Sequence, residues 1–137
     1  MKRVTGIGGI FFKARDHAAL REWYRVHLGI DVQDWGGAVF NWHQPGTTTW
    51  SIFPQATDYF SPGTASFMIN YRVDDLDSVL RELREEGCQV DERVEQSEYG
   101  RFGWVTDPEG NPQSFDFDAS YTEAGFSLTD QAPPHVS

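Results

Sequence analysis

The sequence predicts an α+β domain made of two consecutive copies of a βαβββ unit. Each half of the chain places an amphipathic helix after an apolar strand pattern, and three short strand patterns follow each helix. The chain has 137 residues, the length of one domain or of two small modules that share a core.

In the first half, the apolar segment GIGGIFFKARD (6–16) predicts a strand that ends at a helix-capping residue, Asp16. The next residues, HAALREWYRVHLG, place leucines and aromatic rings on one helical face, and Gly29 ends the helix. Three strands are then expected in the segments IDVQDW (30–35), GAVFNWHQ (37–44) and TTTWSIFP (47–54).

The second half repeats this order. SFMINYRVDD predicts a strand that ends at Asp75, and LDSVLRELREEG predicts a helix that ends at Gly87. The two capping aspartates are 59 positions apart and the two glycines 58, which indicates an internal repeat. Three strands are expected in the segments CQVDERV (88–94), GRFGWVTD (100–107) and PQSFDFD (112–118).

These patterns divide the chain into four parts. They are a first βαβββ module (1–54), a linker (55–64), a second βαβββ module (65–118) and a C-terminal tail (119–137). The linker QATDYFSPGT is rich in turn residues. The tail has no clear hydrophobic period and is expected to be loosely ordered.

The segment TDPEGNPQSFDF (106–117) predicts a tight hairpin turn. Asp107 suits the first turn position, Pro108 presets the second, and Gly110 can take positive φ at the fourth. The strand that follows carries Ser114 and Asp116, so the turn presents two polar side chains to one face of the predicted sheet.

The composition predicts a soluble protein without a nucleic-acid partner. Its net charge is −10, whereas a nucleic-acid-binding protein needs a basic stripe. The acidity serves solubility alone or attracts cationic small molecules. Cys88 is the single cysteine, so no intrachain disulfide or Cys-based zinc site is expected. Neither a signal peptide nor an apolar run of ~20 residues is present, so a cytoplasmic protein without a membrane partner is expected.

The combined pattern resembles the vicinal oxygen chelate superfamily, the group of glyoxalase I, bleomycin-resistance proteins, fosfomycin-resistance enzymes and extradiol dioxygenases. The matching segments are FFKARDHAALREWYRVHLGI, YRVDDLDSVLRELREEG and GRFGWVTDPEGN. The resemblance implies an α+β fold in which two βαβββ modules form an open, cup-shaped mixed sheet with the helices outside. It also implies a homodimer, whereas function is left open because one fold hosts many functions.

In this superfamily, His or Gln on the first strand and Glu on the last strand of each module hold a divalent metal in the cup. Carried over by the spacing from the capping aspartates and the DPEGN turn, the four ligand positions correspond to Gly9, Ser51, Met68 and Ser114. None of these is a good ligand for a hard or borderline divalent ion. The resemblance therefore implies a cup that has lost its metal, and no cofactor or catalytic residue is expected.

Residues two positions away share the predicted cup wall, because strand side chains alternate between faces. The wall combines large rings with a few polar groups, as small-molecule sites do. The expected ligand-binding residues are Gly9, Phe11, Lys13, Ser51, Phe53, Met68, Asn70, Arg72, Ser114 and Asp116.

The leading hypothesis is a glyoxalase/bleomycin-resistance-like protein, not an enzyme, that sequesters or carries an aromatic or cationic small molecule in a metal-free cup. Two alternatives stay open. One is a metal-dependent glyoxalase-like lyase or dioxygenase with non-standard ligands, and the other is a non-catalytic scaffold with a filled cup. The cup lies either within one chain or between the two chains of a homodimer.

Overall fold

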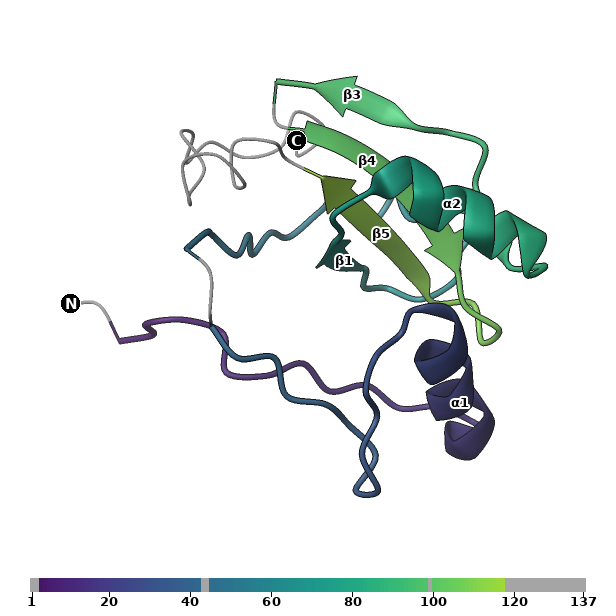
Figure 1. Ribbon diagram of the computed structural model, residues 1–137. Helices are drawn as coiled ribbons and strands as arrows, with labels where there is room; N and C mark the ends of the chain where they lie inside the picture. The colour runs from purple at the N-terminus through teal and green to yellow at the C-terminus, as the bar shows by residue number, and fades with distance from the viewer. Residues whose placement is uncertain (1–2, 43–44, 99, 118–137) are drawn as a thin grey trace.

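The protein is described by a computed structural model over residues 3–42, 45–98 and 100–117. The expected C-terminal tail, 119–137, lies outside these residues. Two helices and one mixed sheet make up the regular structure (Figure 1). In chain order the elements are α1 (His17–His27), β1 (Ile69–Arg72), α2 (Leu76–Glu85), β2 (Gln89–Val90), β3 (Glu95–Ser97), β4 (Gly100–Thr106) and β5 (Pro112–Phe117).

The five strands form an open sheet in the order β1-β5-β4-β2, and β3 pairs with another part of β4. β1 is parallel to β5, whereas every other pair is antiparallel. The α+β class with an open mixed sheet is therefore confirmed. α2 crosses one face of this sheet, and α1 lies beside the hairpin that joins β4 to β5 (Figure 1).

The first half forms its helix but not its strands. Residues 3–42 and 45–68 contain no strand, so the strands expected at 6–16, 30–35, 37–44 and 47–54 are absent as far as the chain is described. A strand exists only where a neighbouring strand pairs with its backbone. The backbone bonds within 30–37 are instead local turns, such as the one from Gln33 N to Gly37 O at 2.8 Å.

The second half follows its predicted order more closely. The strands expected at 100–107 and 112–118 are β4 and β5, and the strand expected in SFMINYRVDD is β1. The strand expected at 88–94 shrinks to the two residues of β2, and an additional strand, β3, follows it. These two short strands pair with opposite ends of β4.

Both helix starts and both helix stops are confirmed. The Asp16 carboxylate accepts the N–H of Ala19 at 3.0 Å, and the Asp75 carboxylate accepts the N–H of Ser78 at 3.1 Å. Each bond satisfies one of the four unpaired N–H groups of a helix N-terminus. None of the helices in the described part of the chain is long and apolar enough to span a bilayer.

The main hydrophobic core lies between α2 and the sheet. Three leucines of α2, Leu76, Leu80 and Leu83, contact Val105 of β4 and Phe115 of β5. All five side chains are almost completely buried. Burying large apolar side chains is the main favourable contribution to folding, so this face of the sheet anchors the second half.

The DPEGN turn is built around one buried carboxylate. Asp107 is 2% exposed, and its Oδ1 accepts the backbone N–H groups of Glu109 at 2.9 Å and Asn111 at 3.0 Å. Its Oδ2 accepts the Asn111 side-chain amide and the Tyr24 hydroxyl, each at 2.7 Å. Gly110 completes the turn with φ +85°, a backbone conformation that side chains disfavour.

Tyr24 joins this turn to α1. Its hydroxyl donates to Asp107 and accepts the side-chain amide of Gln113 at 2.7 Å. Burial, together with the bond to Asp107, raises the pKa of Tyr24, so the phenol remains a donor. At the other end of α1, the Glu109 carboxylate accepts the N–H groups of Arg15 at 2.7 Å and Asp16 at 2.9 Å. The hairpin of the second half therefore holds the helix of the first half at two points.

Replacing Tyr24 with Phe is expected to lower the free energy of unfolding by about 1–3 kcal/mol, because Asp107 loses a donor and Gln113 an acceptor inside the protein. Urea unfolding followed by circular dichroism measures this change. Glu22→Gln is the control, because its ion pair with Arg25 is exposed and its removal should change little. Equal unfolding midpoints for Tyr24→Phe and the wild type would show that the network contributes nothing.

Glu109 predicts a pH dependence. The N–H groups of Asp16 and then Arg15 lower the pKa of Glu109 below its ordinary value of 4.5. A lowered folded-state pKa contributes stability that is present above pH 4.5 and is lost as the pH falls through the lowered value. Unfolding measured between neutral and acidic pH should therefore show a shallower acid loss for Glu109→Gln than for the wild type. Parallel pH profiles for the two proteins would contradict this.

Candidate ligand-binding site

The candidate site lies on the face of the sheet opposite α2, which we call the cup face. Side chains on β4 and β5 alternate, so Val105 and Phe115 contact α2 while their neighbours Trp104 and Ser114 point the other way. The strand register determines which residues lie side by side across neighbouring strands on this face, and we call each such set a row. Asn70, Ser114 and Trp104 form one row across three strands, and Arg72, Asp116 and Phe102 form the next.

A polar pair lies in the first row. The Asn70 side-chain amide donates to the Ser114 Oγ at 2.8 Å. Ser114 is 2% exposed, whereas Asn70 lies on the surface. Asn70 therefore keeps one side-chain acceptor and one remaining amide proton for a molecule resting on the cup face.

An aromatic cluster covers the neighbouring part of the face. Tyr59, Phe102 and Trp104 are buried together, and the Phe53 ring stacks on Tyr59 at 5.5 Å with an interplanar angle of 3°. Tyr59 meets the Trp104 ring edge-on at 5.8 Å and 89°. Phe60 packs beside them, 5.3 Å from the Phe53 ring. These rings build an apolar wall beside the polar pair.

Arg93 adds a cation to this wall. Its guanidinium lies 3.8 Å from the centre of the Trp104 ring and 5.3 Å from that of Tyr59. A guanidinium on the face of an aromatic ring is attracted by the ring's quadrupole. The Asp91 carboxylate is 3.9 Å away, so the charge is also partly balanced. Burial and the nearby Glu95 raise the pKa of Tyr59, which keeps the phenol neutral beside this cation.

The linker was expected only to connect the modules, yet it supplies part of the site. Tyr59 and Phe60 fold over the cup face, and the N–H of Thr64 donates to Gly110 O at 2.8 Å, which fastens the linker to the hairpin. Two adjacent aromatic residues within a turn-rich linker are the signal that could have predicted this role. Arg93 carried no comparable signal, because a single Arg in a polar segment usually lies in solvent.

The structure brings together six of the ten expected ligand-binding residues. Those on or against the cup face are Phe53, Met68, Asn70, Arg72, Ser114 and Asp116. The Arg72 guanidinium also donates to Thr47 O at 3.3 Å, so it contacts the first half of the chain.

The other four expected residues lie on first-half segments that form neither helix nor strand, and none of them belongs to the buried clusters on the two faces of the sheet. They are Gly9, Phe11, Lys13 and Ser51, all exposed, and the Phe11 side chain is 91% accessible. Their expected place in the wall required the first-half strands, which do not form within the described chain. Whether any of the ten residues binds a ligand stays a prediction.

The donor set at the superfamily's metal positions does not fit a divalent metal. Met68 packs its thioether against the aromatic cluster, and the Ser114 hydroxyl already accepts the Asn70 amide. Gly9 offers no side chain, and Ser51 is exposed on an extended segment. Neutral hydroxyl and thioether groups are weak ligands for ions that prefer carboxylates and imidazoles. No reaction step through a cup metal follows from these residues.

Comparison with known proteins shows which family and which solved structures this chain is similar to. Residues 9–115 match the family model of the glyoxalase-like domain. The fold is similar to that of TnmS3, an antibiotic binding protein from Streptomyces sp. CB03234, with a TM-score of 0.55, 19% identity, and coverage of 85% of this chain and 98% of that one. A protein of unknown function from Agrobacterium tumefaciens str. C58 gives a TM-score of 0.50 at 16% identity over 89% of this chain and 98% of its own.

A glyoxalase/bleomycin resistance protein from Streptomyces sp. CB03234 is also similar, with a TM-score of 0.48 and 21% identity over 76% of this chain and 93% of its own. The comparison with curated proteins gave no match. At identities this low, the TM-scores of 0.55 and 0.50 given by the first two proteins show a shared fold and nothing finer. Because the family model covers most of the sequence, the chain belongs to the glyoxalase-like domain family, as its resemblance to the vicinal oxygen chelate superfamily implied.

Proposed function

We propose that this protein binds a small aromatic or cationic molecule on the cup face and sequesters or carries it without chemical change. The observation that carries the proposal is the Asn70–Ser114 pair beside the wall formed by Tyr59, Phe102 and Trp104. Apolar walls bury the body of a small ligand, and a few polar groups orient it. One row of the cup face carries both an aromatic ring, Trp104, and the polar pair of Asn70 and Ser114.

The residues of the cup face favour binding over catalysis. The Ser114 Oγ accepts a hydrogen bond from an amide, and a serine nucleophile needs instead a base that accepts its proton. The metal positions carry the unsuitable donors described above. A metal-dependent lyase or dioxygenase would therefore require metal ligands from other positions. This enzyme function remains the alternative hypothesis.

Two further observations support the proposal. TnmS3, whose fold is similar to this one, is an antibiotic binding protein. The net charge of −10 attracts cations over long range. Within the wall, however, Arg93 already covers the Trp104 ring. Tyr59 and Trp104 are only 9% and 4% exposed, so an aromatic ligand would reach these rings only where Arg93 or the linker moves aside. A cationic ligand would have to displace the guanidinium or bind elsewhere on the face.

We also propose that a second copy of the chain completes the cup. The extended segments of the first half expose pairs of large apolar residues at strand spacing, Phe40 with Trp42 and Trp50 with Ile52. Trp42 is 89% exposed. Large exposed apolar surface of this kind marks a protein interface. In a homodimer, these segments would gain the backbone partners that the sheet of their own chain does not provide.

Ligand binding is tested by titrating the protein with a panel of aromatic and cationic compounds while tryptophan fluorescence is recorded. At least one compound should change the signal, and Asn70→Ala should weaken its binding by roughly tenfold, because the ligand loses one hydrogen bond. Gln96→Ala is the matched control. Gln96 pairs with Arg101, whose guanidinium donates to Asp77 of α2, and paired residues of neighbouring strands share a face, so Gln96 lies on the α2 face. Both variants should melt within a few degrees of the wild type.

Silence across the whole panel would favour a scaffold with a filled cup. Equal affinities for Asn70→Ala and the wild type would contradict the role given to the polar pair. A large loss of stability in Asn70→Ala would show that this residue supports the fold instead of a ligand.

Sedimentation velocity tests the second copy. The wild type should sediment as a dimer of the 15.6 kDa chain, and the double variant Trp42→Asp/Ile52→Asp as a monomer, because the charges block burial of the apolar pairs. Val26→Asp changes an exposed apolar residue of α1 and should remain a dimer. A wild-type monomer at micromolar concentrations would contradict the proposal.

A further inference from the structure

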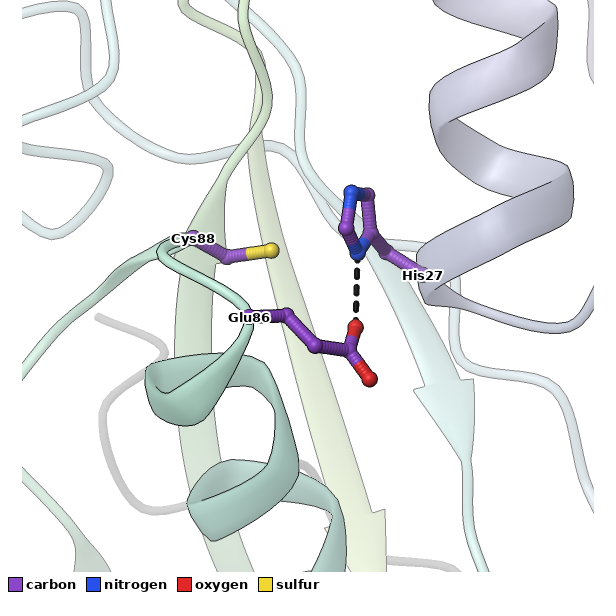
Figure 2. A group of neighbouring side chains, drawn as sticks. All are labelled: His27, Glu86 and Cys88. Atoms are coloured by element: carbon purple, nitrogen blue, oxygen red, sulfur yellow. Dashed lines mark hydrogen bonds and ion pairs between the residues drawn. The ribbon is translucent and has the colours of Figure 1, made fainter.

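Three side chains with metal-binding atoms meet on the side of the sheet away from the cup face. They are His27, which is the last residue of α1, and Glu86 and Cys88, which directly follow α2 (Figure 2). One ligand atom from each lies within 4.8 Å of the others. The His27 Nδ1 and the Glu86 Oε1 are 2.6 Å apart. The three ligand atoms are a nitrogen, an oxygen and a sulfur.

The backbone at the end of α2 fixes two of these residues. Gly87 has φ +82°, its N–H bonds to Arg84 O at 3.1 Å, and the N–H of Cys88 bonds to Leu83 O at 2.9 Å. This pair of bonds is a Schellman motif, a tight helix end that requires positive φ at the residue after the cap. Glu86 and Cys88 therefore leave the helix in a defined geometry on either side of the turn.

The third residue comes from the other half of the chain. His27 is held at the end of α1, whose start and middle are fastened to the DPEGN turn through Glu109 and Asp107. Its ring packs against Trp23 at 5.4 Å. His27 and Glu86 lie at the ends of the two helices of the internal repeat, so the repeat brings residues from both halves of the chain into contact.

We propose that His27, Glu86 and Cys88 bind one divalent ion of the Zn²⁺ class. Zinc accepts imidazole nitrogen, carboxylate oxygen and thiolate sulfur in one tetrahedral shell, whereas Ca²⁺ and Mg²⁺ prefer oxygen alone. Ligand atoms around a tetrahedral zinc are roughly 3.3–3.8 Å apart, so small side-chain rotations suffice. The ion would replace the hydrogen bond between His27 and Glu86.

The fourth coordination position is open to solvent. The His27 and Glu86 side chains are 20% and 43% exposed, so a water or a small ligand can reach the ion. Burial and then the Glu86 charge raise the pKa of the Cys88 thiol, so the sulfur carries a proton when no ion is bound. Binding releases that proton to solvent, as thiolate coordination requires. This site is separate from the cup face and departs from the expectation that the protein has no metal.

The test uses the full chain, freed of metal by a chelator and titrated with Zn²⁺ against a chromophoric competitor. One ion should bind per chain, and Cys88→Ser, His27→Gln and Glu86→Gln should each weaken binding by roughly tenfold or more. His17→Gln is the matched control, because it removes an exposed histidine from the opposite end of the same helix. Circular dichroism of the metal-free variants establishes that each one folds.

A second measurement identifies the sulfur directly. Co²⁺ added to the wild type should give a thiolate-to-cobalt charge-transfer band, and Cys88→Ser should abolish it. Zinc should also raise the melting temperature of the wild type but not of Cys88→Ser, because the ion joins the ends of α1 and α2. Unchanged affinity in Cys88→Ser, or no binding at all, would overturn the proposal. Ligand binding on the cup face should be the same in Cys88→Ser, so failure of one proposal leaves the other standing.

Discussion

The carboxylate of Asp107 is the interaction on which the arrangement of the two halves depends. It is buried, and four donors from the turn and from α1 satisfy it. Removing a buried carboxylate from water is costly unless hydrogen bonds replace the water. Tyr24 can supply one of those bonds only when α1 lies against the hairpin, so the position of the helix and the shape of the turn determine each other.

The two faces of the sheet that this hairpin carries differ in composition. The face toward α2 is filled by leucines, Val105 and Phe115 and supplies the core. The cup face carries polar side chains among rings, and part of it remains exposed at Asn70. A rigid sheet with its core on one side can tolerate polar groups on the other, which is the arrangement that a binding site on a stable scaffold requires.

Local signals in the sequence predicted the local structure well. The two capping aspartates, the DPEGN turn and the alternation that puts Asn70 and Ser114 on one face depend on neighbouring residues and strand parity. The prediction of strands in the first half was wrong because strand pairing depends on a partner that is distant in the sequence, and no short pattern encodes that partner. The place of Tyr59 on the cup face likewise depends on how the linker folds back, and a linker's composition does not determine its path. Arg93 reaches the Trp104 ring from the segment between β2 and β3, whose path is equally undetermined by its composition.

The hairpin also explains how a superfamily turn can persist while the residue at position 114 is a serine. Asp107, Glu109 and Asn111 all use their side chains to hold the turn and α1. Ser114 lies three residues further on, and its side chain points to the cup face, away from these bonds. The turn therefore constrains the backbone of β5 but not the chemistry that β5 presents. An intact DPEGN motif is evidence for the fold, whereas function has to be inferred from the side chain at position 114 and its neighbours.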